Sequence, residues 1–127
     1  MCDYDRYEEI IQRIKIYYGS QFQEELFLKG GCYWLADYLH RHLTSSFIMM
    51  NKEQEHCAIE IQNQLYDITG KISSRRYVWA NERNLAYMKK HYRPNFNVRA
   101  LERYLEQYHN ADQKNSVMAL ERIISYD

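Results

Sequence analysis

The stretch Gly30-Gly31-Cys32-Tyr33-Trp34-Leu35-Ala36 constrains the fold of this chain more than any other. From Cys32 onward, apolar residues recur with helical spacing, at Leu35, Ala36, Leu39 and Leu43. This spacing predicts a helix from Cys32 to about Leu43 with one apolar stripe. The two glycines before it let the backbone turn tightly and let another group approach it closely.

Cys32 has two interpretations at this position. It falls in the first turn of the predicted helix, where free N–H groups and the positive end of the helix dipole favour a thiolate, so it is a candidate nucleophile. It is also a small apolar residue at a helix start, where a free cysteine is often simply buried. Taken alone, the segment favours the second interpretation.

The length and charge of the chain narrow the classes of function. Its 127 residues predict one domain, 1–127, with one core. Lys+Arg and Asp+Glu are both 17, so the formal net charge is zero, and nothing indicates a nucleic-acid or membrane partner. The 13 tyrosines can fill the margin of a core or line an interaction surface.

The cysteines and histidines argue against disulfides and metal. The 3 cysteines are an odd number and their spacing fits no disulfide scaffold, and no signal peptide or bilayer-length apolar run is visible. We therefore expect a reduced, cytoplasmic protein. There is no C-x-x-C pair, and His40 and His42 point in different directions on a helix, so we expect no metal and no cofactor.

The remaining patterns predict an α+β domain. Helices are expected over 3–18, ending at Gly19, over 81–92, from Asn97, and from Asp112 or Ser116; strands are expected over 47–50, 56–61 and 65–69, with an extended segment over 71–80. Residues 20–29 form a connector. We expect a small antiparallel sheet packed on a central helix headed by Cys32, with a core over 30–70 and a helical C-terminal part over 81–127.

The predicted hairpin places a histidine and an aspartate on one face. His56 begins its first strand and Asp67 lies on its second. A two-residue loop, either Gln62-Asn63 or Asn63-Gln64, puts both side chains on the same face, and the first option makes them diagonal neighbours. A three-residue loop would reverse this parity.

The opposite face of the hairpin is the more apolar one, carrying Ile59, Ile61, Tyr66 and Ile68. If the helix headed by Cys32 packs on the face of His56, it meets Ala58 and Leu65. The more apolar face must then be covered by another element, and we expect the C-terminal helices to cover it.

Cys32, His56 and Asp67 together have the chemistry that a thiol nucleophile needs. A histidine takes the proton from the thiol, and a carboxylate holds the imidazole and stabilises its charge. Each residue also has a simpler interpretation, since His56 can be an exposed strand residue and Asp67 can shape a turn. Their order and placement together favour a catalytic or formerly catalytic site.

Residues 30–70 resemble the papain-like cysteine enzymes. The resemblance rests on Gly-Gly-Cys-Tyr-Trp-Leu-Ala opening a helix, His-Cys-Ala-Ile-Glu-Ile on one strand and Leu-Tyr-Asp-Ile-Thr-Gly on the next. It is strongest for the transglutaminase-like branch, whose order is Cys, His, Asp. It implies a minimal papain-like fold, with Cys32 as nucleophile, His56 as general base and Asp67 as orienting residue.

The resemblance also implies acyl transfer on amides or esters, as in proteolysis, deamidation, transamidation or amide hydrolysis. The candidate substrate-binding residues lie beside the nucleophile, at Gly31, Tyr33 and Trp34. No glutamine stands in an obvious oxyanion position, which leaves the backbone N–H of Cys32 and one further donor, for which Gln23 is the candidate.

Two other classes of function stay open. A non-catalytic protein-binding or inhibitory protein on a papain-like frame, such as a viral or mobile-element effector, would use aromatic helix surfaces at Tyr87/His91 and Tyr104/Tyr108. Nucleic-acid binding would use 75–77 and 89–93, but such basic runs are usually solvated faces. We expect a protein or peptide as substrate or partner and no membrane; the sequence does not indicate the oligomeric state.

Overall fold

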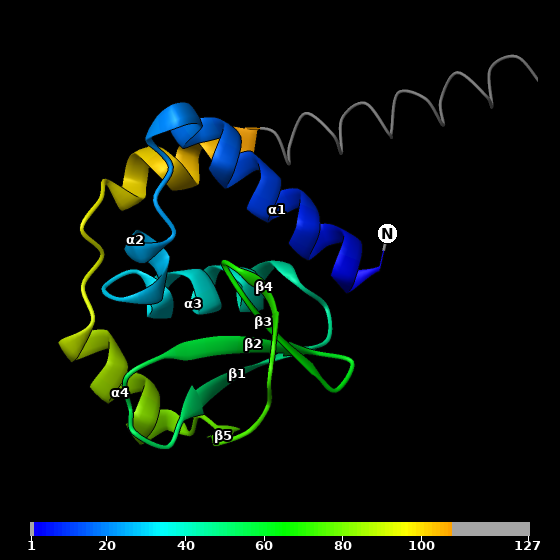
Figure 1. Ribbon diagram of the computed structural model, residues 1–127, viewed down its shortest axis with the longest axis vertical. Coiled ribbons are helices and arrows are strands. Elements are labelled where there is room, and N and C mark those ends of the chain that lie inside the picture. Colours follow the sequence, from blue (N-terminus) through cyan, green and yellow to red (C-terminus); the bar gives the residue numbers. More distant parts are fainter. Residues whose placement is uncertain (1, 108–127) are drawn as a thin grey trace, which may run out of the picture. The chain divides into compact units, whose positions relative to one another are not determined.

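The computed structural model describes residues 2–107. They belong to two compact units, and the boundary in the sequence follows Phe96. The first unit contains the elements labelled in Figure 1, which are α1 (Asp3–Tyr18), α2 (Glu25–Leu28), α3 (Cys32–His42), β1 (Ser46–Asn51), β2 (Cys57–Ile61), β3 (Gln64–Asp67), β4 (Gly70–Ile72), β5 (Tyr77–Trp79) and α4 (Glu82–His91). A 3-10 turn, η1 (Gly19–Gln21), follows α1. The predicted α+β class is confirmed.

The second unit begins at Asn97, and the structure describes its residues 97–107. A helix over 98–107 starts there, and the Asn97 side chain accepts a hydrogen bond from the Ala100 N–H at 3.1 Å, as an N-cap does. The predicted helix from Asp112 or Ser116 lies outside the described residues, as does Tyr108.

The sheet is antiparallel with strand order β4-β3-β2-β1-β5. β2 and β3 form the predicted hairpin, with Ile61 opposite Gln64 and positive φ at both loop residues, Gln62 (51°) and Asn63 (65°). This is a two-residue turn whose twist suits a hairpin. The first of the two loop options is therefore correct, and it is the one that makes Asp67 a diagonal neighbour of His56.

The segment 71–80 forms two short strands. β4 begins at Gly70, whose φ of 110° lets the chain reverse directly after β3. β5 pairs with β1 at the other edge of the sheet, so the sheet has five strands and exceeds the minimal hairpin-based sheet that the sequence suggests.

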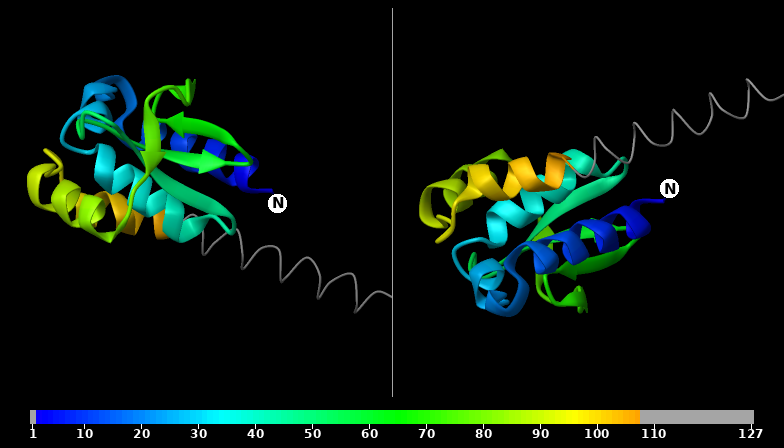
Figure 2. Two further views of the ribbon diagram at one scale, coloured as in Figure 1. Left: turned by 90° about the horizontal axis from the view of Figure 1, so that it is seen from below. Right: turned by 90° about the horizontal axis from the view of Figure 1, so that it is seen from above.

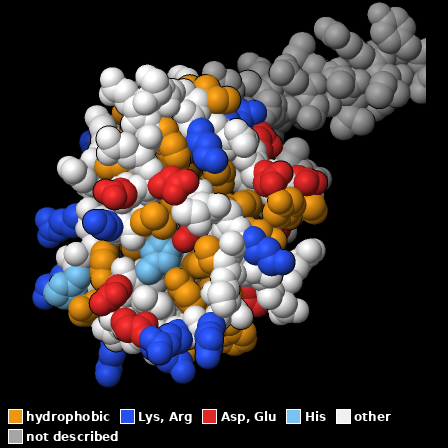
Figure 3. All heavy atoms as spheres, viewed as in Figure 1, with side chains coloured by type: hydrophobic (Ala, Val, Ile, Leu, Met, Phe, Trp, Pro, Cys, Tyr) orange, Lys and Arg blue, Asp and Glu red, His pale blue; other side chains and the backbone are white. Residues whose placement is uncertain are grey.

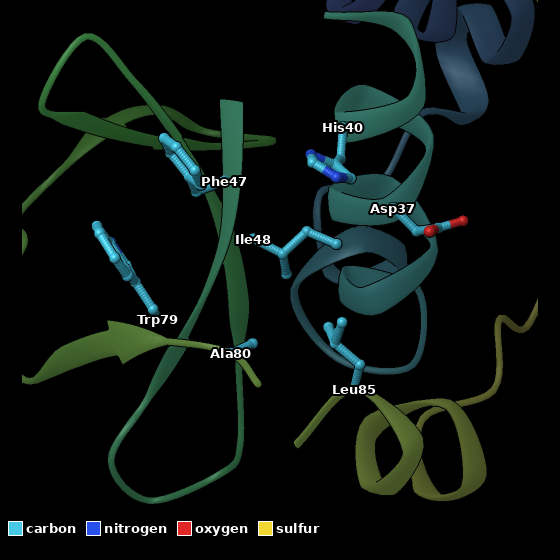
Figure 4. A pocket seen from close by; sticks show the side chains of 7 residues that line it. All are labelled: Asp37, His40, Phe47, Ile48, Trp79, Ala80 and Leu85. Atoms are coloured by element: carbon cyan, nitrogen blue, oxygen red, sulfur yellow. The ribbon is translucent and has the colours of Figure 1, made fainter. Parts of the chain in front are cut away.

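α3 packs on the richer apolar face of the sheet. The narrow space between them is lined by Leu35 and Leu39 of α3 and by Cys57 and Ile59 of β2, and Figure 4 shows Ile48 of β1 pointing toward α3. α3 therefore does not pack on the face of Leu65, the arrangement considered from the sequence. Packing α3 on the larger apolar side chains removes more apolar surface from water.

The opposite face of the sheet has its own small cluster. Met49, Ala58 and Leu65 are buried there, and Ile72 and Tyr77 pack against them from β4 and β5. The two short edge strands thus contribute side chains to this cluster. Figure 2 shows α3 running beside the sheet in both turned views.

Close backbone packing fixes the start of α3. A Cβ at Gly31 would lie 2.3 Å from the Leu26 carbonyl oxygen, and one at Gly30 would lie 2.3 Å from the Arg93 carbonyl oxygen. Only glycine admits these approaches. α2 and the segment after α4 thereby hold the first turn of α3, and with it Cys32, in one position.

The surface carries charges of both signs. Figure 3 shows Lys, Arg, Asp and Glu side chains spread over one face, with hydrophobic side chains between them. Within residues 2–107, no helix is both long and apolar enough to cross a bilayer.

Candidate active site

Three different elements bring Cys32, His56 and Asp67 together. Cys32 is the first residue of α3, His56 directly precedes β2, and Asp67 is the last residue of β3. All three are largely shielded from solvent: Cys32 is 2% exposed, and the side chains of His56 and Asp67 are 14% and 7% exposed. The site therefore lies where the N-terminus of a helix meets one end of the hairpin.

The Asp67 carboxylate is fixed on both of its oxygens. Oδ2 lies 3.0 Å from Nε2 of His56, and Oδ1 accepts hydrogen bonds from the backbone N–H (2.8 Å) and the hydroxyl of Thr69. The Tyr7 hydroxyl donates to the Asp67 carbonyl oxygen. Burial raises the pKa of Asp67, but the hydrogen bonds from His56 and Thr69 outweigh it and leave that pKa below its usual value. Asp67 is thus held as a carboxylate facing the imidazole.

The backbone of His56 is held by Asn51. The Asn51 side-chain oxygen accepts from the N–H groups of Glu55 (2.8 Å) and His56 (2.9 Å), and the Asn51 N–H donates to the His56 carbonyl (3.0 Å). The His56 ring meets Tyr77 edge-on at 6.5 Å between centroids. Asn51 therefore fixes the backbone of His56, while Tyr77 and Asp67 orient its ring.

The Cys32 thiol contacts both His56 and Cys57. Its pKa is lowered to about 5, first because the Cys57 thiol donates a hydrogen bond to the sulfur, while burial opposes this. Hydrogen bonds from His56 and from the Cys57 N–H, and the charge of His56, lower it further. Because Nε2 of His56 is engaged with Asp67, Nδ1 is the ring nitrogen left to face the sulfur.

The pKa of His56 moves in the opposite direction. Burial lowers it, but the hydrogen bond to Asp67 and the hydrogen bond and charge of Cys32 raise it overall, to about 9. Between pH 5 and pH 9, the favoured state is therefore a thiolate at Cys32 beside an imidazolium at His56. A nucleophile paired with its own proton donor is what thiol-dependent acyl transfer requires.

The Phage YunG-like protein family matches residues 10–106, which is most of the chain. The chain belongs to this family. The Phage YunG-like match includes Cys32, His56 and Asp67 and every element of the first unit after the opening turns of α1. No curated protein and no solved structure matches the chain.

The predicted oxyanion donors make other hydrogen bonds in this Phage YunG-like chain. The Cys32 N–H, which the resemblance assigns to that role, donates to the Lys29 carbonyl at 3.4 Å. Gln23 is exposed in the connector before α2, and its backbone carbonyl accepts from Leu26. The role of Gln23 stays a prediction.

The three predicted substrate-binding residues have different surroundings. Trp34 is 7% exposed and packs against Phe27, Tyr38 and Phe96 in the core. The space over Gly31 holds the Leu26 carbonyl and the Phe96 ring. Tyr33 is half-buried, and its pKa is raised, first by burial and then by the charge of Asp37.

The sulfur is closed off in this conformation. The space between α3 and the sheet beside Cys32 is too narrow for a water molecule. Next to it, the Tyr92 hydroxyl donates to the Gln54 carbonyl at 2.7 Å and ties the segment after α4 to the 52–55 loop. The pKa of Tyr92 is raised, first by burial and then by the charge of Cys32.

Sequence reasoning missed four residues of the site. Cys57 is adjacent to His56 and was taken only as a strand residue. Asn51 opens the loop before His56, and Thr69 stands two residues after Asp67, a spacing typical of side chains that bond nearby backbone. Tyr7 lies 60 residues from Asp67, and no local pattern indicates that contact. Among the described residues, no cluster of three or more His, Cys, Asp or Glu side chains could hold a metal.

Proposed function

We propose that this chain is a thiol-dependent acyl-transfer enzyme with a Cys32-His56-Asp67 triad in a papain-like, transglutaminase-like arrangement. One observation carries the proposal: the His56 imidazole bridges a fixed carboxylate, at 3.0 Å, and a thiol at the N-terminus of a helix. The pKa of Cys32 is lowered and the pKa of His56 is raised, and these shifts favour a thiolate–imidazolium pair at neutral pH.

The residues suggest the following steps. The Cys32 thiolate attacks the carbonyl carbon of an amide or ester, and the negative charge that develops on the carbonyl oxygen is stabilised at the N-terminus of α3. His56 gives its proton to the leaving amine or alcohol, and a thioester remains on Cys32. His56, now neutral, takes a proton from water or an amine, which attacks the thioester and regenerates the thiol.

Asp67 acts through His56 in these steps. Its carboxylate keeps Nε2 of the imidazole protonated, so that Nδ1 exchanges the proton with sulfur and leaving group. The expected substrate is a protein or peptide, and Tyr33, half-buried beside Cys32, is the proposed contact for it. Because Cys32 is 2% exposed, acylation follows local opening of the site, which releases the Tyr92–Gln54 bond.

The test is release of the leaving group from a small activated ester, followed by a peptide amide. Cys32→Ala and His56→Ala should each lower the rate by about 100-fold or more. Cys2→Ala is the matched control, since Cys2 is an exposed thiol outside the site, and its rate should equal that of the wild type. A Cys32→Ala variant that folds, by circular dichroism, and retains full activity would exclude the mechanism.

A specific surface feature favours a second candidate, a non-catalytic protein-binding or inhibitory protein. Phe47 and Trp79 are 52% and 66% exposed and stack on each other at 5.4 Å between centroids. They border a pocket of about 270 Å³ between β1, β5, α3 and α4, which Figure 4 shows. Exposed aromatic anchors of this kind are typical of protein interfaces.

The two candidates predict opposite mutational results. If the chain acts only by binding, Cys32→Ala retains its biological effect and Trp79→Ala abolishes it. If it acts as an acyl-transfer enzyme, Cys32→Ala is inactive whatever happens at Trp79. Both variants should be compared with Cys2→Ala as the neutral substitution.

A further inference from the structure

The acyl-transfer proposal does not use Cys57, although Cys57 lines the same narrow space as the nucleophile. Cys57 opens β2 and Cys32 opens α3, both side chains are 2% exposed, and both line the same narrow space between helix and sheet. Each thiol shifts the pKa of the other, and both are free thiols. A chemically reactive thiol thus stands against a second buried thiol that the proposed reaction does not need.

The two thiols differ in protonation. Cys32 is the one held as a thiolate, whereas the pKa of Cys57 is raised, first by its hydrogen bond to Cys32 and then by burial. An attacking thiolate beside a protonated partner is the usual arrangement for oxidation of one cysteine followed by condensation with the other.

From this juxtaposition we propose that Cys32 and Cys57 form an oxidative modification site, which a hydroperoxide converts to an intramolecular disulfide. When the site opens locally, the Cys32 thiolate attacks the peroxide O–O bond, and with one proton gives Cys32–SOH and an alcohol, or water if the oxidant is H₂O₂. The Cys57 thiol then attacks the Cys32 sulfur, the S–OH bond breaks, and water leaves with the Cys57 proton. The cysteine pair loses two electrons, and the peroxide gains them.

The disulfide would remove the proposed nucleophile while protecting it. Burial shields Cys32–SOH from bulky external thiols, so Cys57, already in contact, reacts first. Reduction by a small dithiol restores both thiols, whereas a sulfinic acid at Cys32 would be irreversible.

The test is mass spectrometry of the whole chain after treatment with H₂O₂ and alkylation under denaturing conditions. In the wild type we expect two thiols to resist alkylation, and trypsin to yield peptide 30–41 linked to peptide 53–71, a link that a dithiol reductant cleaves. The measurement uses no substrate and no activity. A chain that forms the disulfide but transfers no acyl group would refute the proposed function and leave this inference standing.

Matched variants separate a specific pair from general oxidation. Cys57→Ser keeps a hydrogen-bond donor but cannot form the disulfide, so sulfenic acid at Cys32, trapped with a carbon nucleophile, should rise by about tenfold or more. Cys2→Ser should behave as the wild type. The inference is overturned if the wild type accumulates sulfenic or sulfinic acid at Cys32 with Cys57 still free, or if Cys32 pairs with Cys2.

Discussion

Replacing His56 by alanine should raise the pH at which Cys32 becomes reactive. In the wild type the pKa of Cys32 is lowered to about 5 by hydrogen bonds from Cys57 and His56 and by the charge of His56, against burial. The variant keeps the contribution of Cys57 and loses that of His56. A neighbouring opposite charge lowers a pKa by about one to three units, so the alkylation midpoint should rise by about that amount.

The midpoint tests this better than the rate at one pH. With a pKa of about 5, roughly three-quarters of Cys32 is thiolate at about pH 5.5, and a shift of about two units would leave only a few per cent. A more basic thiolate is intrinsically more nucleophilic, by roughly eightfold over such a shift. The net loss of rate is therefore only about threefold, whereas the midpoint moves by the full shift.

The assay is alkylation by iodoacetamide from about pH 4 to about pH 10, quantified on tryptic peptide 30–41, which separates Cys32 from the other two cysteines. Burial of the sulfur slows the reaction equally at each pH, so it does not move the midpoint. A wild-type midpoint near that of an ordinary thiol, or equal midpoints in wild type and His56→Ala, would refute the thiolate–imidazolium pair.

Three further substitutions have defined outcomes. Asp67→Asn should lower the pKa of His56 from about 9 toward 6.5, because the imidazolium loses its charged partner; an NMR titration that still gives about 9 would contradict this. Thr69→Val should cost about 1 kcal/mol in urea unfolding through the lost hydroxyl bond to Asp67, with Thr69→Ser restoring it, and no loss would show that this bond is not stabilising. Gly31→Ala should lower the free energy of unfolding by several kcal/mol, because a Cβ there meets a backbone carbonyl at 2.3 Å. Gly19→Ala should lower it by only about 1 kcal/mol, because a Cβ there meets no atom and only the φ of 59° is unfavourable for alanine. Equal shifts in thermal unfolding would contradict the packing argument.

Local patterns predicted the elements that hold the site. The helix spacing after Cys32 and the period-2 alternation around Gln62-Asn63 correspond to α3 and the β2–β3 hairpin. The parity of the two-residue loop placed His56 and Asp67 on one side of the hairpin, and the structure has them 3.0 Å apart. These are consequences of backbone geometry within about a dozen residues, which a sequence can reveal.

Long-range packing was outside the reach of those patterns. Which face of the hairpin α3 covers depends on β4 and β5, whose three-residue strands carry too weak a pattern to predict. The contact of Tyr7 with Asp67 joins residues 60 apart. The need for glycine at Gly31 arises from the Leu26 carbonyl and the Phe96 ring, which only the folded chain brings there.

The acyl thioester is the most direct evidence for the proposed function. The chain is mixed with a small activated ester, quenched in acid within the first turnover, and its peptides are weighed. We expect one acyl group per chain, on Cys32 in peptide 30–41, removable by hydroxylamine and missing in His56→Ala at the same time point. Acylation confined to lysines or to Cys2, with Cys32 unmodified, would contradict the proposed acyl-transfer function.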